Sequence, residues 1–74
     1  MKRVDENTIG GRIRKVRLDR GLSQREFEKS IYTSGNIGNW ELGKNMPSCK
    51  MIISICKIYG VSADWLLGLK GEDK

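Results

Sequence analysis

The stretch that decides the fold reads Leu22-Ser23-Gln24-Arg25-Glu26-Phe27, then Ser34-Gly35-Asn36-Ile37-Gly38-Asn39-Trp40-Glu41, then Gly43-Lys44-Asn45-Met46-Pro47-Ser48. Ser23 and Glu26 have the spacing of a capping box, in which each side chain accepts a hydrogen bond from the other residue's backbone N–H. This signal predicts a helix that starts at the Ser23 cap, continues to about Ile31 and buries Leu22, Phe27 and Ile31.

A second short helix is expected after a very tight turn. Thr33 or Ser34 can cap it, and it ends before Gly43. Ile37 and Trp40 lie three residues apart and face inward, so we interpret Trp40 as a core residue rather than a stacking platform. Two short helices joined in this way form a helix-turn-helix, whose second helix enters the major groove of DNA.

Serine and threonine caps, with glycine stops, predict three further helices. The caps are Thr8, Ser48 and Ser62, and the stops are Gly21 and Gly60. Apolar residues at helical spacing follow the caps, namely Ile9, Ile13 and Val16, then Ile52, Ile55, Cys56 and Tyr59, then Trp65, Leu66 and Leu67. The expected fold class is therefore all-α with five helices. We expect a flexible N-terminal arm over residues 1–7, a helix-turn-helix domain over residues 8–68 and a C-terminal tail over residues 69–74.

The composition limits what a chain of 74 residues can do. A domain of this size buries about 60% of the surface that its unfolded chain exposes, which leaves little room for a deep pocket. Histidine is absent, so the commonest general base and the commonest metal ligand are both missing. We expect no enzyme, no metal site and no cofactor. No apolar run approaches the length of about 18 residues that crosses a membrane, and a cytoplasmic location is expected.

The positive charge is concentrated in one part of the chain. The net charge is +5; residues 1–50 hold 11 Lys and Arg against 6 Asp and Glu, whereas residues 51–74 hold 3 of each. The excess therefore lies in the part that contains the two short helices. Charge alone is equally consistent with a solvated basic face, but together with the motif it favours a surface that binds phosphates.

The two cysteines, Cys49 and Cys56, lie seven residues apart on one predicted helix. Their Cα atoms would be roughly 10 Å apart on that helix, which is too far for a disulfide. We expect both to be reduced, buried thiols.

With these motifs in place, the chain resembles the phage repressor and Cro family, also called the Xre or lambda-repressor-like family. The residues that carry the resemblance extend from about Ile9 to Leu67. They are Ile9-Gly10, Ile13-Arg14, Arg17, Leu22-Ser23-Gln24, Asn39-Trp40-Glu41-Leu42-Gly43-Lys44, Pro47-Ser48, Gly60-Val61-Ser62 and Leu66-Leu67. The resemblance implies five helices, with the second and third as the DNA-binding pair. It also implies two-fold dimers that bind operator DNA and control transcription.

The resemblance also implies which side chains contact DNA. The expected DNA-binding residues are Gln24, Arg25, Thr33, Ser34, Gly35, Asn36, Asn39, Lys44 and Asn45. Gln24 matches a family glutamine that hydrogen-bonds a phosphate and supports the recognition helix, and Lys44 and Asn45 fall in a loop that touches phosphates. The residue types agree with these roles, because a helix N-terminus binds anions and an asparagine such as Asn36 can pair with adenine N6 and N7. Thr33 and Ser34 can cap the helix instead.

Arg17 and Glu41 match a partly buried ion pair of similar proteins, which connects the first helix to the end of the third. The alternatives are a phosphate contact for Arg17 and an exposed anion for Glu41.

The sequence departs from the family pattern at the turn. Most relatives have a glycine there, in a conformation with positive φ. In this chain Ile31-Tyr32-Thr33-Ser34 contains no glycine and is one residue short. Either Tyr32 takes the strained conformation or the preceding helix ends earlier. Gly35 and Gly38 also weaken the expected recognition helix, since each costs about 1 kcal/mol relative to alanine.

These observations favour a sequence-specific regulator of transcription, a repressor, that binds a palindromic operator in double-stranded DNA as a homodimer. Trp65, Leu67 and Leu69 are the candidate dimer contacts, although Trp65 can equally be buried within the monomer. The alternative is a non-enzymatic protein-interaction module, or an antitoxin-like component, with the same fold.

Overall fold

The computed structural model describes residues 7–33 and 36–70. In chain order the helices are α1 (Ile9–Asp19), α2 (Gln24–Ser30), α3 (Ile37–Glu41), α4 (Cys49–Tyr59) and α5 (Ala63–Leu66). Within those two ranges the chain forms no strand, so the expected all-α fold with five helices is confirmed. The expected arm and tail lie mostly outside the described residues, and so do Ser34 and Gly35.

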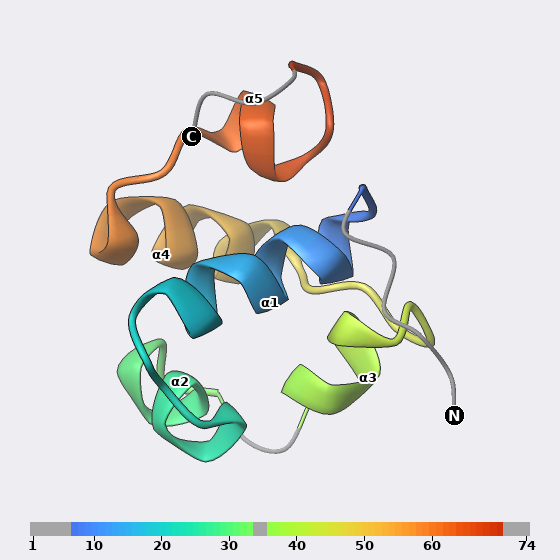
Figure 1. The fold of residues 1–74 in the computed structure, drawn as a ribbon. Coiled ribbons are helices and arrows are strands. Elements are labelled where there is room, and N and C mark those ends of the chain that lie inside the picture. Colours follow the sequence, from blue (N-terminus) through green and yellow to red (C-terminus); the bar gives the residue numbers. More distant parts are fainter. Residues whose placement is uncertain (1–6, 34–35, 71–74) are drawn as a thin grey trace.

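Helix α1 lies in the middle of the molecule, with α2 and α3 on one side of it and α4 and α5 on the other (Figure 1). It packs against both α3 and α5, while α2 packs against α3 and α4 packs against α5. Helices α2 and α3 therefore lie at the end of the molecule opposite α5 (Figure 1).

Four of the helices begin at the side-chain caps that the sequence predicts. Thr8, Ser23, Ser48 and Ser62 have extended backbone conformations, and each side chain accepts a hydrogen bond from the backbone N–H three residues later. The Ser23 and Glu26 capping box is complete. Such caps satisfy N–H groups that have no partner within the helix, and each stabilises its helix by about 1 kcal/mol.

The ends of α1, α2, α3 and α5 share one hydrogen-bond pattern, the Schellman motif. In α1, the Leu22 N–H donates to the Arg17 carbonyl and the Gly21 N–H donates to the Leu18 carbonyl. The residue with positive φ in this motif is Gly21 in α1, Gly43 after α3 and Gly68 after α5. After α2 the same position holds Tyr32, with φ 58°.

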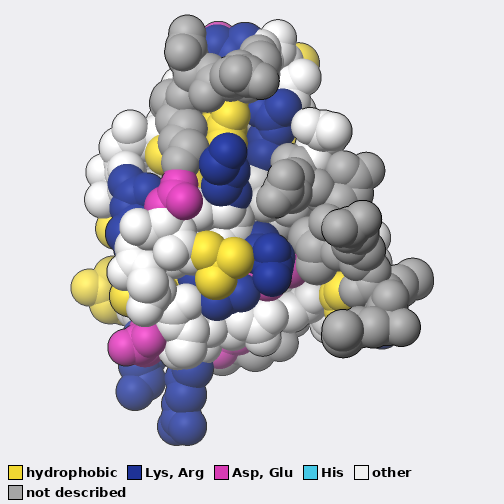
Figure 2. Space-filling view, viewed as in Figure 1, with side chains coloured by type: hydrophobic (Ala, Val, Ile, Leu, Met, Phe, Trp, Pro, Cys, Tyr) yellow, Lys and Arg dark blue, Asp and Glu magenta, His cyan; other side chains and the backbone are white. Residues whose placement is uncertain are grey.

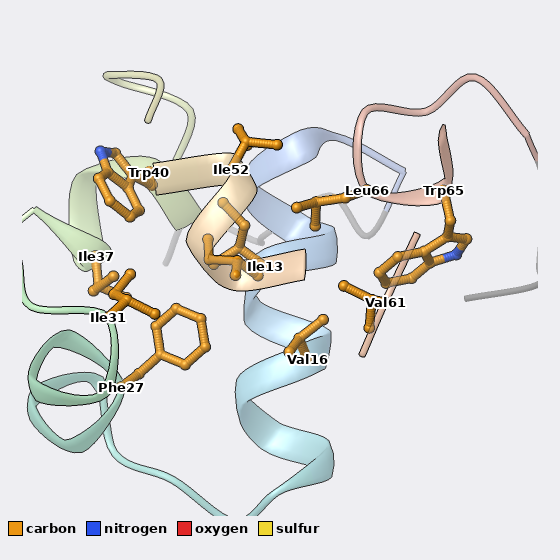
Figure 3. Close-up of a cluster of buried hydrophobic side chains, with 11 residues drawn as sticks. Ile13, Val16, Phe27, Ile31, Ile37, Trp40, Ile52, Val61, Trp65 and Leu66 are labelled. Carbon is orange, nitrogen blue, oxygen red and sulfur yellow. The ribbon is translucent and has the colours of Figure 1, made fainter. Parts of the chain in front are cut away.

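One hydrophobic core connects all five helices. It consists of Ile13, Val16, Phe27, Ile31, Ile37, Trp40, Ile52, Ile55, Val61, Trp65 and Leu66. The side chains of α2 and α3 gather on one side of this cluster, and those of Val61 and α5 gather on the other (Figure 3). Removal of this apolar surface from water is the main force that holds helices as short as α3 and α5 in place, because isolated helices of such length are unstable.

Gly10 allows α1 and α3 to approach each other closely. A Cβ atom at this position would lie 1.7 Å from the carbonyl oxygen of Trp40. Because the obstacle is backbone, a side chain at residue 10 would push the two helices apart. The position of α3 therefore depends on the absence of a single side chain in α1.

The prediction that both cysteines are buried is wrong for Cys49. Cys49 is exposed, because it is the first residue of α4 and the core side of this helix is formed by Ile52 and Ile55. Cys56 is half-buried, and burial raises the pKa of its thiol. The two thiols are free in the structure, as the spacing argument requires.

The three candidate dimer contacts differ in their exposure to solvent. Trp65 is 3% exposed and belongs to the core of the monomer, so of the two alternatives for this residue the structure shows burial within the monomer. Leu67 and Leu69 are exposed and follow directly after α5. Arg12 holds this segment on α1, since its Nη1 donates to the carbonyls of Trp65 and Lys70 at 2.6 and 3.1 Å.

Candidate nucleic-acid interface

The candidate interface is built on α2, α3 and the turns that flank them. The N-terminus of α2 is ordered by its capping box, in which the Ser23 N–H donates to Glu26 Oε1 at 2.8 Å and the Glu26 N–H donates to Ser23 Oγ at 3.0 Å. The hydrogen bonds from the Ser23 backbone and then from its side chain lower the pKa of Glu26. The cap leaves Gln24 and Arg25 exposed in the first turn of α2.

Gln24 connects the start of α2 to the end of α3. Its Nε2 donates to Glu41 Oε1 at 3.2 Å, and its side chain lies beside Gly38. A Cβ atom at Gly38 would be 3.5 Å from Gln24 Oε1, which is ordinary van der Waals contact. The Gln24 side chain thus rests on α3 while it stays accessible to solvent.

Glu41 is the centre of a buried polar network. Arg17 Nε donates to Glu41 Oε2 at 2.7 Å and Arg17 Nη2 donates to Glu41 Oε1 at 3.1 Å, in a two-pronged ion pair. The two side chains are only 10% and 3% exposed. A third Arg17 nitrogen, Nη1, donates to the Leu22 carbonyl at 2.8 Å. The guanidinium therefore faces the interior, and the alternative of an exposed phosphate contact for Arg17 does not fit this structure.

The turn between α2 and α3 differs from the prediction. The helix predicted to start near Thr33 or Ser34 begins at Ile37, with Asn36 as its N-cap residue. The physical reason is the Schellman motif of α2, in which the Tyr32 N–H donates to the Lys29 carbonyl and the Thr33 N–H donates to the Glu28 carbonyl. Of the two alternatives, Tyr32 does take positive φ, and α2 ends at Ser30.

The polar residues at the start of α3 are less constrained than those at its end. Asn36 is exposed and is the N-cap residue, but its side chain makes no capping hydrogen bond. Thr33 is half-buried, and it does not cap α3. Ser34 and Gly35, both expected to bind DNA, lie outside the described residues. Within the part of this segment that is described, Asn36 is therefore the exposed side chain that could contact a base.

The turn after α3 is held by the backbone of Asn39. The carbonyl of Asn39 accepts hydrogen bonds from the N–H groups of Lys44 and Asn45, at 2.9 and 3.4 Å. Asn39 is half-buried, and the side chains of Lys44 and Asn45 are exposed. The structure thus presents the last two on the loop where the family resemblance expects phosphate contacts.

Basic side chains project from the α2 end of the molecule (Figure 2). The exposed cations of α2 are Arg25 and Lys29, and Lys44 is exposed after α3. Of the acidic residues nearby, Glu41 is paired with Arg17, Glu28 is half-buried, and Glu26 is exposed and takes part in the capping box. The electrostatic character of this end is suited to a polyanion.

Sequence reasoning missed three features of this region. It did not predict the Gln24–Glu41 hydrogen bond, the 92% exposure of Tyr32, or the bond from Arg20 Nη2 to the Tyr59 carbonyl at 2.6 Å that connects the end of α1 to the end of α4. The attraction of cations to the carbonyls at helix C-termini was an available signal for Arg20. The other two depend on how elements distant in sequence pack.

In residues 7–33 and 36–70, no cluster of His, Cys, Asp and Glu is suited to hold a metal ion. None of the described helices is long and apolar enough to cross a membrane.

The fold and this geometry agree with comparisons to known proteins. The helix-turn-helix domain family matches residues 10–72, so the chain belongs to this family. It is 36% identical over 60 residues to YonR of Bacillus subtilis (strain 168), named as an SPbeta prophage-derived uncharacterized HTH-type transcriptional regulator. It is 31% identical over 62 residues to ImmR, an HTH-type transcriptional regulator of the same organism.

The alignments cover 80% and 82% of this chain but 56% and 49% of YonR and ImmR. The chain therefore spans about half the length of the curated relatives it matches. No solved structure matches the chain significantly.

Proposed function

We propose that this protein is a sequence-specific regulator of transcription, a repressor of the phage repressor and Cro class, that inserts α3 into the major groove of double-stranded DNA. The observation that carries the proposal is the network of Arg17, Glu41 and Gln24, which fixes α3 against α1 and α2. It holds two short helices in a defined arrangement and leaves the polar start of α3 exposed, as a major-groove reader requires. The names of YonR and ImmR support the same function.

The proposal assigns two kinds of contact to the exposed side chains. Gln24 and Arg25, at the N-terminus of α2, and Lys44 and Asn45, after α3, bind phosphate oxygens and set the position of the domain on the duplex. Asn36 reads a base, because a carboxamide pairs with adenine N6 and N7 in the major groove. Thr33, Ser34, Gly35 and Asn39 complete the set of DNA-binding residues.

A dimer on a palindromic operator is part of the proposal. One helix-turn-helix covers only a few base pairs, and a two-fold dimer would double the contacts on half-sites about 34–36 Å apart. The exposed Leu67 and Leu69 are the remaining candidates for the dimer contact. The protein would act in the cytoplasm, where the DNA is, without an enzymatic step, a metal or a cofactor.

Selection of binding sites from a random duplex library at about 150 mM salt tests this function. We expect the wild type to enrich a palindrome. Asn36→Ala should lose preference at one position of each half-site, at a cost of about 1–3 kcal/mol in binding free energy. Lys44→Ala is the matched control: it should weaken all sequences alike and reduce the slope of log K against log[salt] by about 1.

Two results would contradict the proposal. Salt-sensitive binding to every duplex without enrichment would leave an electrostatic DNA binder with no operator. If no duplex were bound at all, the fold would serve as a protein-interaction module.

A further inference from the structure

Tyr32 is the most exposed large hydrophobic residue of the structure, at 92%. It is also the one described residue other than glycine that has positive φ. It lies between α2 and α3, at the position in the Schellman motif of α2 where the corresponding motifs of α1, α3 and α5 have Gly21, Gly43 and Gly68.

Both properties are unfavourable for the isolated domain. A Cβ atom at positive φ crowds the backbone, whereas glycine adopts this conformation freely. An exposed aromatic ring buries no surface in the core, so the strain is not offset by packing. At the three equivalent helix ends this chain has glycine, which takes positive φ without strain. A strained, exposed residue at a fourth points to a role outside the monomer, since strain of this kind is retained at functional positions.

The backbone on both sides directs the Tyr32 side chain outward. The Tyr32 N–H donates to the Lys29 carbonyl at 3.3 Å and the Thr33 N–H donates to the Glu28 carbonyl at 3.0 Å. These bonds hold the residue at the end of α2, where its ring is exposed to solvent at the start of the segment that leads to α3. Lys29, exposed one turn earlier in α2, adds positive charge beside it. The exposed phenol has an apolar ring and an O–H donor, and both can contact a ligand because the side chain is not packed in the core.

We infer that Tyr32 is a DNA-contacting residue, whose phenolic O–H donates a hydrogen bond to a phosphate oxygen beside the bases that α3 reads. Tyrosine is among the side chains that contact DNA phosphates, and such contacts fix register rather than sequence. The contact would set how deeply the start of α3 enters the groove. This inference rests on the proposed function, and it adds to the interface a residue that the family resemblance did not indicate.

Two variants of Tyr32 separate the side chain from the backbone strain. Tyr32→Phe keeps the ring and the positive φ but removes the O–H. Tyr32→Gly removes the side chain and relieves the strain. Ile53→Ala, which truncates an exposed apolar side chain of α4, is the matched control. The measurements are the melting temperature and the affinity, over a range of salt concentrations, for the selected operator and for an unrelated duplex.

We expect Tyr32→Phe to weaken binding to both duplexes by about tenfold or more, because a hydrogen bond to a charged group such as phosphate is stronger than one between neutral groups. Tyr32→Gly should weaken binding at least as much while it raises the melting temperature by about 2–8 °C, because glycine fits the left-handed conformation. The slope of log K against log[salt] should not change, since a neutral phenol displaces no counterion. Ile53→Ala should bind as the wild type does.

The outcomes separate this inference from the proposed function. Wild-type affinity in both Tyr32 variants would overturn the inference alone. Weakening by Tyr32→Gly but not by Tyr32→Phe would overturn the phosphate hydrogen bond, and weakening confined to the operator would assign Tyr32 to a base instead. If the wild type bound no duplex, the proposed function would fail and the inference with it.

Discussion

The two ends of α3 are built in opposite ways. At its C-terminal end, Glu41 is buried and accepts hydrogen bonds from Arg17 and Gln24, and the Schellman motif that follows has a glycine at its positive-φ position. At its N-terminal end, Asn36 is exposed and its side chain makes no capping bond. The motif before that end has Tyr32 at positive φ.

The difference separates a fixed end from an exposed end in a helix of five residues. The fixed end supplies the orientation of α3, because buried charge-assisted hydrogen bonds are short and directional. The other end presents polar and aromatic side chains with few partners inside the domain, which leaves them free to bond to a ligand. Substitutions at the two ends should therefore have opposite signatures, with loss of stability at one and loss of binding at the other.

The largest effect is expected at Glu41. Glu41→Ala would leave the Arg17 guanidinium buried without its anion and should lower the free energy of unfolding by about 3–5 kcal/mol. Urea denaturation followed by tryptophan fluorescence measures this. The double variant Arg17→Met with Glu41→Leu should lose much less than the sum of the single variants, because it removes both charges. A loss below about 1 kcal/mol in Glu41→Ala would place this pair among surface ion pairs.

A somewhat smaller loss is expected at the contact between α1 and α3. Gly10→Ala would place a Cβ atom 1.7 Å from the Trp40 carbonyl oxygen, and we expect it to cost about 3 kcal/mol, since the helices must separate. Gly38→Ala is the matched control within α3. It meets only the flexible end of Gln24, so stability should be unchanged or rise by up to about 1 kcal/mol. Equal losses in both variants would show that the close approach does not hold α3.

The smallest effects compare two helix caps. Ser48→Ala removes a hydroxyl that accepts the Met51 N–H at 3.2 Å and should cost about 1 kcal/mol. Asn36→Ala removes a side chain that makes no capping bond, so its stability should remain within about 0.5 kcal/mol of the wild type. Thermal unfolding of both variants measures these two changes in stability. A cost at Asn36 equal to that at Ser48 would mean that Asn36 caps α3 in solution.

Much of this architecture could be predicted from local signals. The caps Thr8, Ser23, Ser48 and Ser62 and the stops Gly21 and Gly60 depend on residues within one turn of each helix end, so the sequence is enough to find them. The start of α3 was not predictable in this way. No capping side chain marks it, and the competing signals at Thr33 and Ser34 are typical of a helix start that the structure does not form there.

The candidate interface was predictable in part for the same reason. The residue types of Gln24, Asn36 and Lys44 and their order along the chain indicate contacts to DNA. Cys49 is exposed because it is the first residue of α4. The burial of Trp65 depends on which face of a short helix meets the core, and a helix of four residues such as α5 has too little periodicity to show this.

The sequence by itself determined five helices, the helix-turn-helix and the concentration of positive charge in residues 1–50, because these follow from caps, periodicity and composition. Only the tertiary structure decided that Gln24 bonds to Glu41, that α1 touches the backbone of α3 at Gly10, and that the side chain of Tyr32 is exposed. The physical reason is the separation along the chain of the residues that interact. Caps and turns are settled by hydrogen bonds between near neighbours, whereas the orientation of α3 depends on contacts between residues far apart in the chain.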